Sequence, residues 1–310
     1  MIGRALETMG RHAPRLLAAG VLVALFVPWL TPYFKPLLVP ALIFPMVIAL
    51  MRIDWGEMIA HAKRPWVVAL FAVWCLILCP LGMAVAAPAI GASPPIEAAL
   101  VLMAAAPPII SSAAIALMLG LDAPFAVVAI VATTALVPFT LPPLALGLLG
   151  IEVDIGLGTL MLRLAAIIGG AFAIALLVRR IVPAEALRRQ APRLDGLSVL
   201  SLWIFALAIM DGVNAALIER PAFVIGVTLL SFGANLALQA ASALAFAWAG
   251  RRLALTIALL GGNCNMGLVL TALADRAELD TVVYFAMAQF PMYMLPAIIQ
   301  PIYRRLLRPS

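Results

Sequence analysis

Two apolar segments, one in each half of the chain, are interrupted at their centres. Residues 97–120 contain Pro107-Pro108 followed by Ser111-Ser112, and residues 253–274 contain Gly261-Gly262-Asn263-Cys264-Asn265. Each segment is long enough to cross a bilayer, yet each carries helix breakers near its middle. Unwound backbone at that depth is tolerated only where protein or a water-filled cavity covers it. Such a pair of segments is typical of the substrate site of a secondary transporter.

The composition indicates a protein embedded in the lipid bilayer. Of 310 residues, 65% are hydrophobic and only 11% are charged, against roughly a quarter charged in soluble domains. The net charge of +6 does not indicate nucleic-acid binding, because the basic residues lie between hydrophobic spans. We expect no catalytic site, because no nucleophile–base spacing, nucleotide loop or histidine cluster is present. Cys75 and Cys79 favour core packing over a metal site, since no histidine or carboxylate is near them.

The hydropathy pattern predicts an all-α polytopic membrane protein with ten transmembrane helices. The predicted spans are residues 14–31, 35–51, 66–87, 95–119, 124–149, 157–178, 196–214, 221–248, 253–274 and 281–303. Arginine and lysine gather on alternate flanks, so the positive-inside rule predicts a multi-pass protein of the cell (inner) membrane with both termini cytoplasmic. The loop that contains Glu152 and Asp154 is expected outside.

Ten spans divide into two sets of five, and the interrupted spans are the fourth and the ninth. An odd number per half predicts two inverted five-helix repeats, as in many secondary transporters. We assign residues 1–178 to the first repeat, 179–195 to a basic cytoplasmic linker, and 196–310 to the remainder of the second repeat, whose spans begin at about residue 157.

Several short motifs resemble those of the bile acid:sodium symporter (BASS) family over nearly the whole chain. They are Leu42–Met51, Cys79-Pro80, Ser93–Glu97 leading into Ala106–Ser112, Thr133–Pro138 and Gly262–Leu268. The resemblance implies a core domain of spans three to five and eight to ten, built on two crossing broken helices. It also implies a panel domain of spans one, two, six and seven, with substrate between the two domains.

The sequence departs from the sodium-coupled members of that family at their ion-binding positions. A sodium site prefers oxygen ligands, best including a carboxylate. Where those members have such side chains, the resemblance places Leu260 or Gly261, Cys264, Ala113 and Cys75. The remaining candidate ion ligands are Ser112, Thr133, Thr134 and Asn265, which are neutral. We therefore expect no Na⁺ site of the usual form and no other cofactor.

The candidate substrate-binding residues lie at the two breaks: Ile109, Ser111, Ser112, Asn263 and Asn265. Asp211, late in the seventh span, is the candidate for proton coupling, although a position in water at the span end is equally compatible with the sequence. Asn235 and Gln239, one turn apart in span eight, favour interhelical hydrogen bonding over ligand binding. The function favoured is transport of a small organic solute, with an anion preferred, by alternating access. The alternatives are a sodium-independent channel or facilitator, and a membrane sensor on the same fold.

Overall fold

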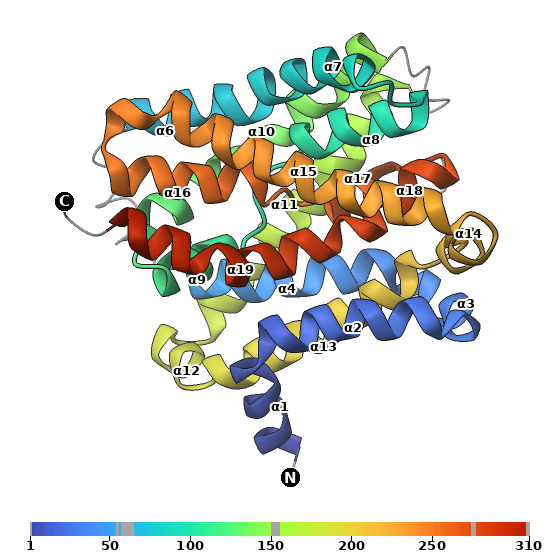
Figure 1. The fold of residues 1–310 in the computed structure, drawn as a ribbon. Helices are drawn as coiled ribbons and strands as arrows, with labels where there is room; N and C mark the ends of the chain where they lie inside the picture. Colours follow the sequence, from blue (N-terminus) through green and yellow to red (C-terminus); the bar gives the residue numbers. More distant parts are fainter. Residues whose placement is uncertain (1, 54–55, 57–64, 150–155, 274–276, 308–310) are drawn as a thin grey trace. The chain divides into compact units, whose positions relative to one another are not determined.

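The described residues fold almost entirely into helices (Figure 1). The computed structural model describes residues 2–307 except 54–55, 57–64, 150–155 and 274–276. Within these ranges there is no β-strand, and one isolated antiparallel bridge joins Pro108 and Cys264. The prediction of a largely helical membrane protein is confirmed. The loop of Glu152 and Asp154 lies outside the described residues.

Among the described residues, seven continuous helical segments are long and apolar enough to cross a membrane. They are Pro28–Arg52, Pro65–Ala89, Ala123–Leu149, Leu157–Ile181, Ala191–Ile209, Pro221–Ala245 and Leu279–Leu307. Every one of these segments has a mean hydropathy of at least 1.4, so all seven are apolar enough to lie in lipid. The chain is therefore a multi-pass membrane protein.

The three remaining predicted spans are not single long helices. The expected span 14–31 is wrong at its end, because α2 (Ala13–Phe26) stops before Pro28 and the next helical segment already begins there. Proline lacks an amide N–H and fits the first turn of a helix, so Pro28 starts the following segment instead of lying inside the first. The other two, residues 95–119 and 253–274, are each divided into two short helices.

Two further boundaries differ from the prediction. Residues 179–195 are mostly helical, because α11 (Leu157–Ile181) runs into them and α12 (Ala184–Arg189) and the start of α13 (Ala191–Ile209) follow. The expected span 196–214 ends early, at Ile209. Gly212 then adopts a positive φ of 74°, which favours glycine, and α14 (Val213–Glu219) begins after it.

The contacts divide the chain into two compact units. The first unit comprises Met1–Ile53 and Ala165–Val227, and the second comprises Asp54–Leu164 and Thr228–Ser310. The first contains α1 (Ile2–Arg11), α2, α3 (Thr31–Phe34), α4 (Leu38–Arg52), α12, α13, α14 and most of α11.

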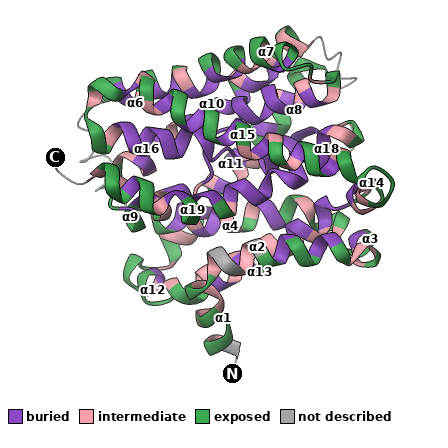
Figure 2. Ribbon diagram, in the orientation of Figure 1, coloured by how far each residue is buried: buried purple, intermediate pink, exposed green. Residues whose placement is uncertain are grey.

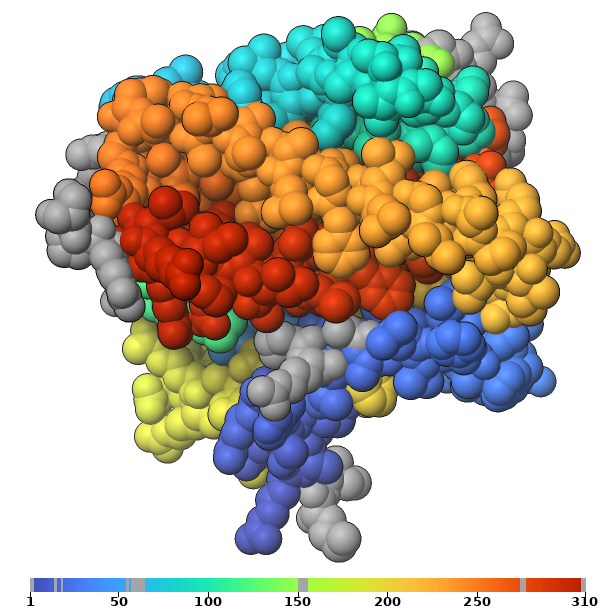
Figure 3. Space-filling view, in the orientation of Figure 1, coloured from blue at the N-terminus to red at the C-terminus, as the bar shows by residue number. Residues whose placement is uncertain are grey.

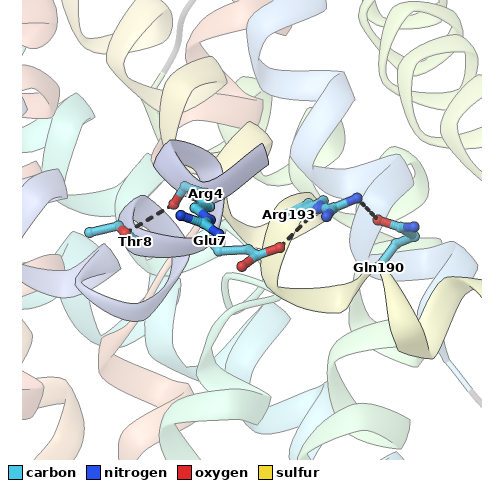
Figure 4. Close-up of polar contacts among 5 residues, drawn as sticks. All are labelled: Arg4, Glu7, Thr8, Gln190 and Arg193. Carbon is cyan, nitrogen blue, oxygen red and sulfur yellow. Dashed lines mark hydrogen bonds and ion pairs between the residues drawn. The ribbon is translucent and has the colours of Figure 1, made fainter. Parts of the chain in front are cut away.

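In the first unit, α13 is the helix on which α1, α2 and α4 pack. The approach of α1 is close, because a Cβ built on Gly196 would lie 2.1 Å from the carbonyl oxygen of Leu6. Arg193 on α13 donates to Glu7 at 2.9 Å and to the side-chain oxygen of Gln190 at 3.1 Å (Figure 4). The N-terminal segment is thus a surface helix held by a glycine contact and an ion pair.

The second unit holds both interrupted segments. Its helices are α6 (Pro65–Val73), a π-helical turn (Trp74–Leu78), α7 (Cys79–Ala89), α8 (Pro94–Ala105), α9 (Ser112–Met118), α10 (Ala123–Leu149), most of α15 (Pro221–Ala245), α16 (Arg251–Gly262), α17 (Met266–Leu273), α18 (Leu279–Met287) and α19 (Gln289–Leu307). Figure 2 shows α16 largely buried and α12 largely exposed. From Ala254 to Gly262 every residue of α16 is buried, so this helix forms the centre of its unit.

Candidate functional site

The first break separates α8 from α9. Two consecutive prolines, Pro107 and Pro108, supply no amide donors, and α8 ends before them. The residue before them, Ala106, is extended at φ −74° and ψ 145°, as expected of a residue that precedes proline. The chain becomes helical again at Ser112, the first residue of α9.

The second break separates α16 from α17 and is made differently. Helix α16 ends at Gly262, and three residues, Asn263, Cys264 and Asn265, lie between it and the start of α17 at Met266. The backbone N–H of Cys264 turns back to the carbonyl oxygen of Gly262 at 3.1 Å. Glycine at the end of α16 makes this departure from helical geometry inexpensive.

The two breaks are joined to each other by a pair of backbone hydrogen bonds. The N–H of Ile109 donates to the carbonyl oxygen of Asn263 at 2.8 Å, and the N–H of Asn265 donates to that of Pro107 at 2.7 Å. These bonds form the isolated bridge between Pro108 and Cys264. Each interrupted segment therefore supplies backbone partners that the other lost when its helix ended. We call this junction the crossing.

Three polar side-chain atoms at the crossing are buried without a partner among the described residues. They are Ser112 Oγ and both Nδ2 and Oδ1 of Asn263. Ser112 and Asn263 have no exposed surface. A buried amide or hydroxyl normally finds hydrogen bonds, since leaving it unpaired costs about 1–3 kcal/mol. Thr31 Oγ1, in the first unit, is the other such atom in the described part of the chain.

The remaining candidate substrate-binding residues have different surroundings. Ile109 is buried and Ser111 is exposed. Asn265 is half-buried, and its Oδ1 accepts from the backbone N–H of Leu268 at 3.3 Å. That bond is the one a helix N-cap makes, so Asn265 stabilises the start of α17.

Among its described residues, the structure shows no side-chain hydrogen bond that joins one of the candidate ion ligands to another. Thr133, on α10, lies within hydrogen-bond distance of the carbonyl oxygens of Ala129 and Ile130 on its own helix, at 2.7 and 3.1 Å. Thr134 is buried beside it. Leu260 and Cys264 are also buried, and neither side chain offers an oxygen. No group of three histidine, cysteine or acidic residues suited to a metal occurs in the described ranges.

Asp211 lies in the first unit, in the turn between α13 and α14. Its carboxylate accepts from Lys35 Nζ at 2.9 Å, and the two side chains are 56% and 50% exposed, respectively. An ion pair with this exposure contributes about 0–1 kcal/mol. The position fits the end of a span, which is one of the two placements that the sequence allowed.

One set of residues was not predicted from the sequence as part of the site. Asn235 Nδ2, on α15, donates to the carbonyl oxygen of Gly262 at 2.8 Å. Gln239 donates to Asn235, and Tyr303 on α19 donates to Gln239. The spacing of Asn235 and Gln239 indicated an interhelical contact, but no sequence signal connected Tyr303 to the break.

The fold and the joined breaks define a helical, multi-pass membrane protein with two interrupted segments. The sequence profile of the sodium bile acid symporter family matches residues 39–220, which is more than half of the chain, and the chain belongs to this family. The match contains the first break and ends before the second. No curated protein matches the chain. Members of this family are membrane transporters.

Proposed function

We propose that this protein is a secondary transporter that moves a small organic solute by alternating access. The observation that carries the proposal is the crossing: two interrupted segments joined at their breaks, with the amide of Asn263 and the hydroxyl of Ser112 buried and unpartnered. An amide offers a donor and an acceptor at one point, so it suits a polar group of the solute. Interrupted helices are where many transporters bind their solutes.

The regular spacing of equivalent elements supports two inverted repeats. Pro65 and Pro221 begin the third span of each set of five, Ala89 and Ala245 end it, and Pro108 and Cys264 form the bridge. Within each of these pairs the two residues are 156 positions apart. The first halves of the interrupted segments, α8 and α16, begin 157 positions apart. A nearly constant interval through these elements is expected of a duplicated five-helix unit.

Matching hydrogen bonds on either side of the crossing give further support. Thr256, near the start of α16, accepts from the backbone N–H of Asp122 at the start of α10 at 3.0 Å. Thr281, in the first turn of α18, donates to the carbonyl oxygen of Pro95 at the start of α8 at 2.9 Å. Each interrupted segment is thus tied to the helix that follows the other. The two contact units support a panel of spans one, two, six and seven and a core of the rest.

An anionic solute is the preferred class. The helices α9 and α17 both begin beside a break, and helix N-termini attract negative charge. The proposed contacts are Ile109, Ser111 and Ser112 on one side and Asn263 and Asn265 on the other.

Coupling to sodium is proposed to be weak. The resemblance puts Leu260, Cys264, Ala113 and Cys75 at the ion-binding positions of sodium-coupled relatives, and none of these side chains carries an oxygen. Ser112, Thr133, Thr134 and Asn265 remain as neutral ligands. Proton coupling through Asp211 is the second arrangement, and its exposed pair with Lys35 gives it little support.

Uptake into proteoliposomes tests the function. The purified full-length chain would be reconstituted and assayed with taurocholate and a panel of small organic carboxylates, with and without a sodium gradient. Saturable uptake that is accelerated by solute preloaded inside supports alternating access. Uptake without saturation or such acceleration would indicate a channel or facilitator. A protein that folds normally but takes up none of the compounds would favour a sensor.

The proposed orientation places the protein in the inner membrane with both termini on the cytoplasmic side. A single cysteine at position 153, in the loop outside the described residues, should react with an impermeant maleimide added to intact cells. A single cysteine at position 190, exposed in the structure, should not react. The reverse pattern would overturn the orientation.

A further inference from the structure

A polar face on α15 points into the second unit. Ser231, Asn235, Gln239 and Ser242 are all buried, with exposed fractions of 0%, 2%, 5% and 0%. Their spacing of four, four and three residues puts them on one side of the helix. Buried polar side chains need partners, so this face must be matched by polar groups on neighbouring helices.

The side chains of Tyr303, Gln239 and Asn235 form a continuous chain of hydrogen bonds. Tyr303 Oη donates to Gln239 Oε1 at 2.8 Å, Gln239 Nε2 donates to Asn235 Oδ1 at 2.7 Å, and Asn235 Nδ2 donates to the carbonyl oxygen of Gly262 at 2.8 Å. Each amide uses its oxygen to accept and its nitrogen to donate, so the chain has one direction and fixes both amide orientations. Figure 3 shows α15 in orange lying against α19 in red on the face drawn.

The end of α16 approaches this face too closely for any side chain larger than hydrogen. A Cβ built on Gly262 would lie 2.4 Å from Gln239 Cγ and 2.8 Å from Asn235 Oδ1. A Cβ built on Gly261 would lie 2.2 Å from Ser242 Oγ, which accepts from Trp74 Nε1 at 2.9 Å. The two glycines therefore allow the helix end to reach the polar face.

We propose that Asn235, Gln239 and Tyr303 are positioning residues that hold the carbonyl end of α16 and thereby orient Asn263 at the crossing. The Gly262 carbonyl belongs to the same planar peptide unit as the backbone nitrogen of Asn263, so fixing that oxygen restricts how the chain enters Asn263. The Asn263 side chain has no partner of its own, so its orientation depends on its backbone. The inference rests on the proposed function for its transport role, but the positioning itself does not.

This chain of hydrogen bonds holds only one of the two interrupted segments, the one that contains α16. At the 156-residue interval, the counterparts of Asn235, Gln239 and Tyr303 are Cys79, Met83 and Gly147. These residues have no amide or hydroxyl, so they cannot build an equivalent chain of hydrogen bonds toward α8. The α16 side of the crossing is therefore anchored by side chains in a way that the α8 side is not.

The native cysteines supply a test that needs no solute. Cys264 is next to Asn263 and buried, and its thiol donates to the Gly261 carbonyl oxygen at 3.4 Å. The full-length protein in lipid nanodiscs would be treated with N-ethylmaleimide, and modification of Cys264, Cys75 and Cys79 followed separately by mass spectrometry. Tyr303→Phe removes one hydroxyl and should raise the modification rate of Cys264 at least about threefold. The rates of Cys75 and Cys79 should change less than twofold.

Tyr293→Phe is the matched control, because Tyr293 lies on the same helix and outside the chain of hydrogen bonds. It should leave all three rates unchanged. Gln239→Leu, which removes two bonds of the chain, should raise the Cys264 rate further, and Tyr303→Phe decides the matter if Gln239→Leu does not fold. An unchanged Cys264 rate in Tyr303→Phe, or an equal rise at all three cysteines, would overturn the proposal. A selective rise in a protein that transports nothing would uphold positioning and reject the proposed function.

Discussion

The break after α8 and the break after α16 meet at one bridge, yet they are made of opposite chemistry. The first uses Pro107 and Pro108, which remove backbone donors and leave no polar side chain between Ala105 and Ser111. The second uses Gly261 and Gly262, which keep their donors, and follows them with two asparagines.

This difference assigns different tasks to the two sides of the crossing. At the first break the two prolines remove backbone donors, and the backbone groups beside them find partners in the main chain of Asn263 and Asn265. Glycine ends a helix only where the surroundings favour it, and here the buried face of α15 does so. The glycine side therefore carries both the tight packing and the unpartnered amide, and we expect it to be the more sensitive to substitution.

The largest expected effect follows from adding one methyl group on the glycine side. Gly262→Ala places a carbon 2.4 Å from Gln239 Cγ, an overpacking that costs about 3 kcal/mol. The thermal unfolding midpoint in detergent should fall by several degrees. Gly233→Ala on α15, where a Cβ would meet nothing within 4 Å, is the control and should be neutral or stabilising by roughly 0.5–1 kcal/mol. Equal midpoints for the two variants would contradict the close approach.

The second expected effect separates the two asparagines. Asn263→Ala should cut uptake by at least about tenfold, or about 1.4 kcal/mol. Its unfolding midpoint should not fall, because the deleted amide has no partner to lose. Asn265→Ala should lower uptake too, but it also removes an N-cap bond worth about 1 kcal/mol, so its midpoint should fall. Proteoliposome uptake and unfolding would be measured on the same preparations, and a lowered midpoint in Asn263→Ala would mean that its amide is bonded.

A smaller effect is expected from the ion in the buffer. Replacing sodium by potassium should change the apparent affinity for the transported solute less than tenfold, about 1.4 kcal/mol. The reason is that Leu260 and Cys264, on the glycine side, offer no oxygen to a hard cation. A steep and saturable dependence on sodium would show that backbone carbonyls with Thr133 and Asn265 suffice as a site.

The smallest effect is expected far from both breaks in the sequence. Asp211→Asn removes the exposed pair with Lys35 and should change stability by less than about 1 kcal/mol. Uptake driven by a pH gradient should be unchanged. If Asp211→Asn abolishes uptake driven by a pH gradient but retains solute binding, proton coupling would be assigned to Asp211 and not to residues of the crossing.

Local sequence features located both breaks within a few residues. Pro107-Pro108 and Gly261-Gly262 are helix breakers, and each pair lies beside small polar residues near the middle of an apolar segment. Breakers alone do not locate a break, because Pro142-Pro143 lies inside the continuous helix α10 and Gly169-Gly170 inside α11. The apolar composition likewise determined a multi-pass helical protein, because only internally bonded backbone is stable in lipid. The misplaced helix end at Pro28 arose because proline can start a helix as well as interrupt one. The early end of the expected span 196–214 arose where Gly212 adopts a positive φ.

Only the tertiary structure distinguished residues that look alike in the sequence. Asn263 and Asn265 are two positions apart and flank the same cysteine, but one is unpartnered and the other caps α17. Tyr303 is one of several aromatic residues near a span end until its hydroxyl is seen to bond Gln239. Hydrogen-bond partners distant in sequence depend on how helices pack, and no local pattern encodes that packing. The sequence therefore determined where the helices break, and the tertiary structure decided which side chains the breaks leave free.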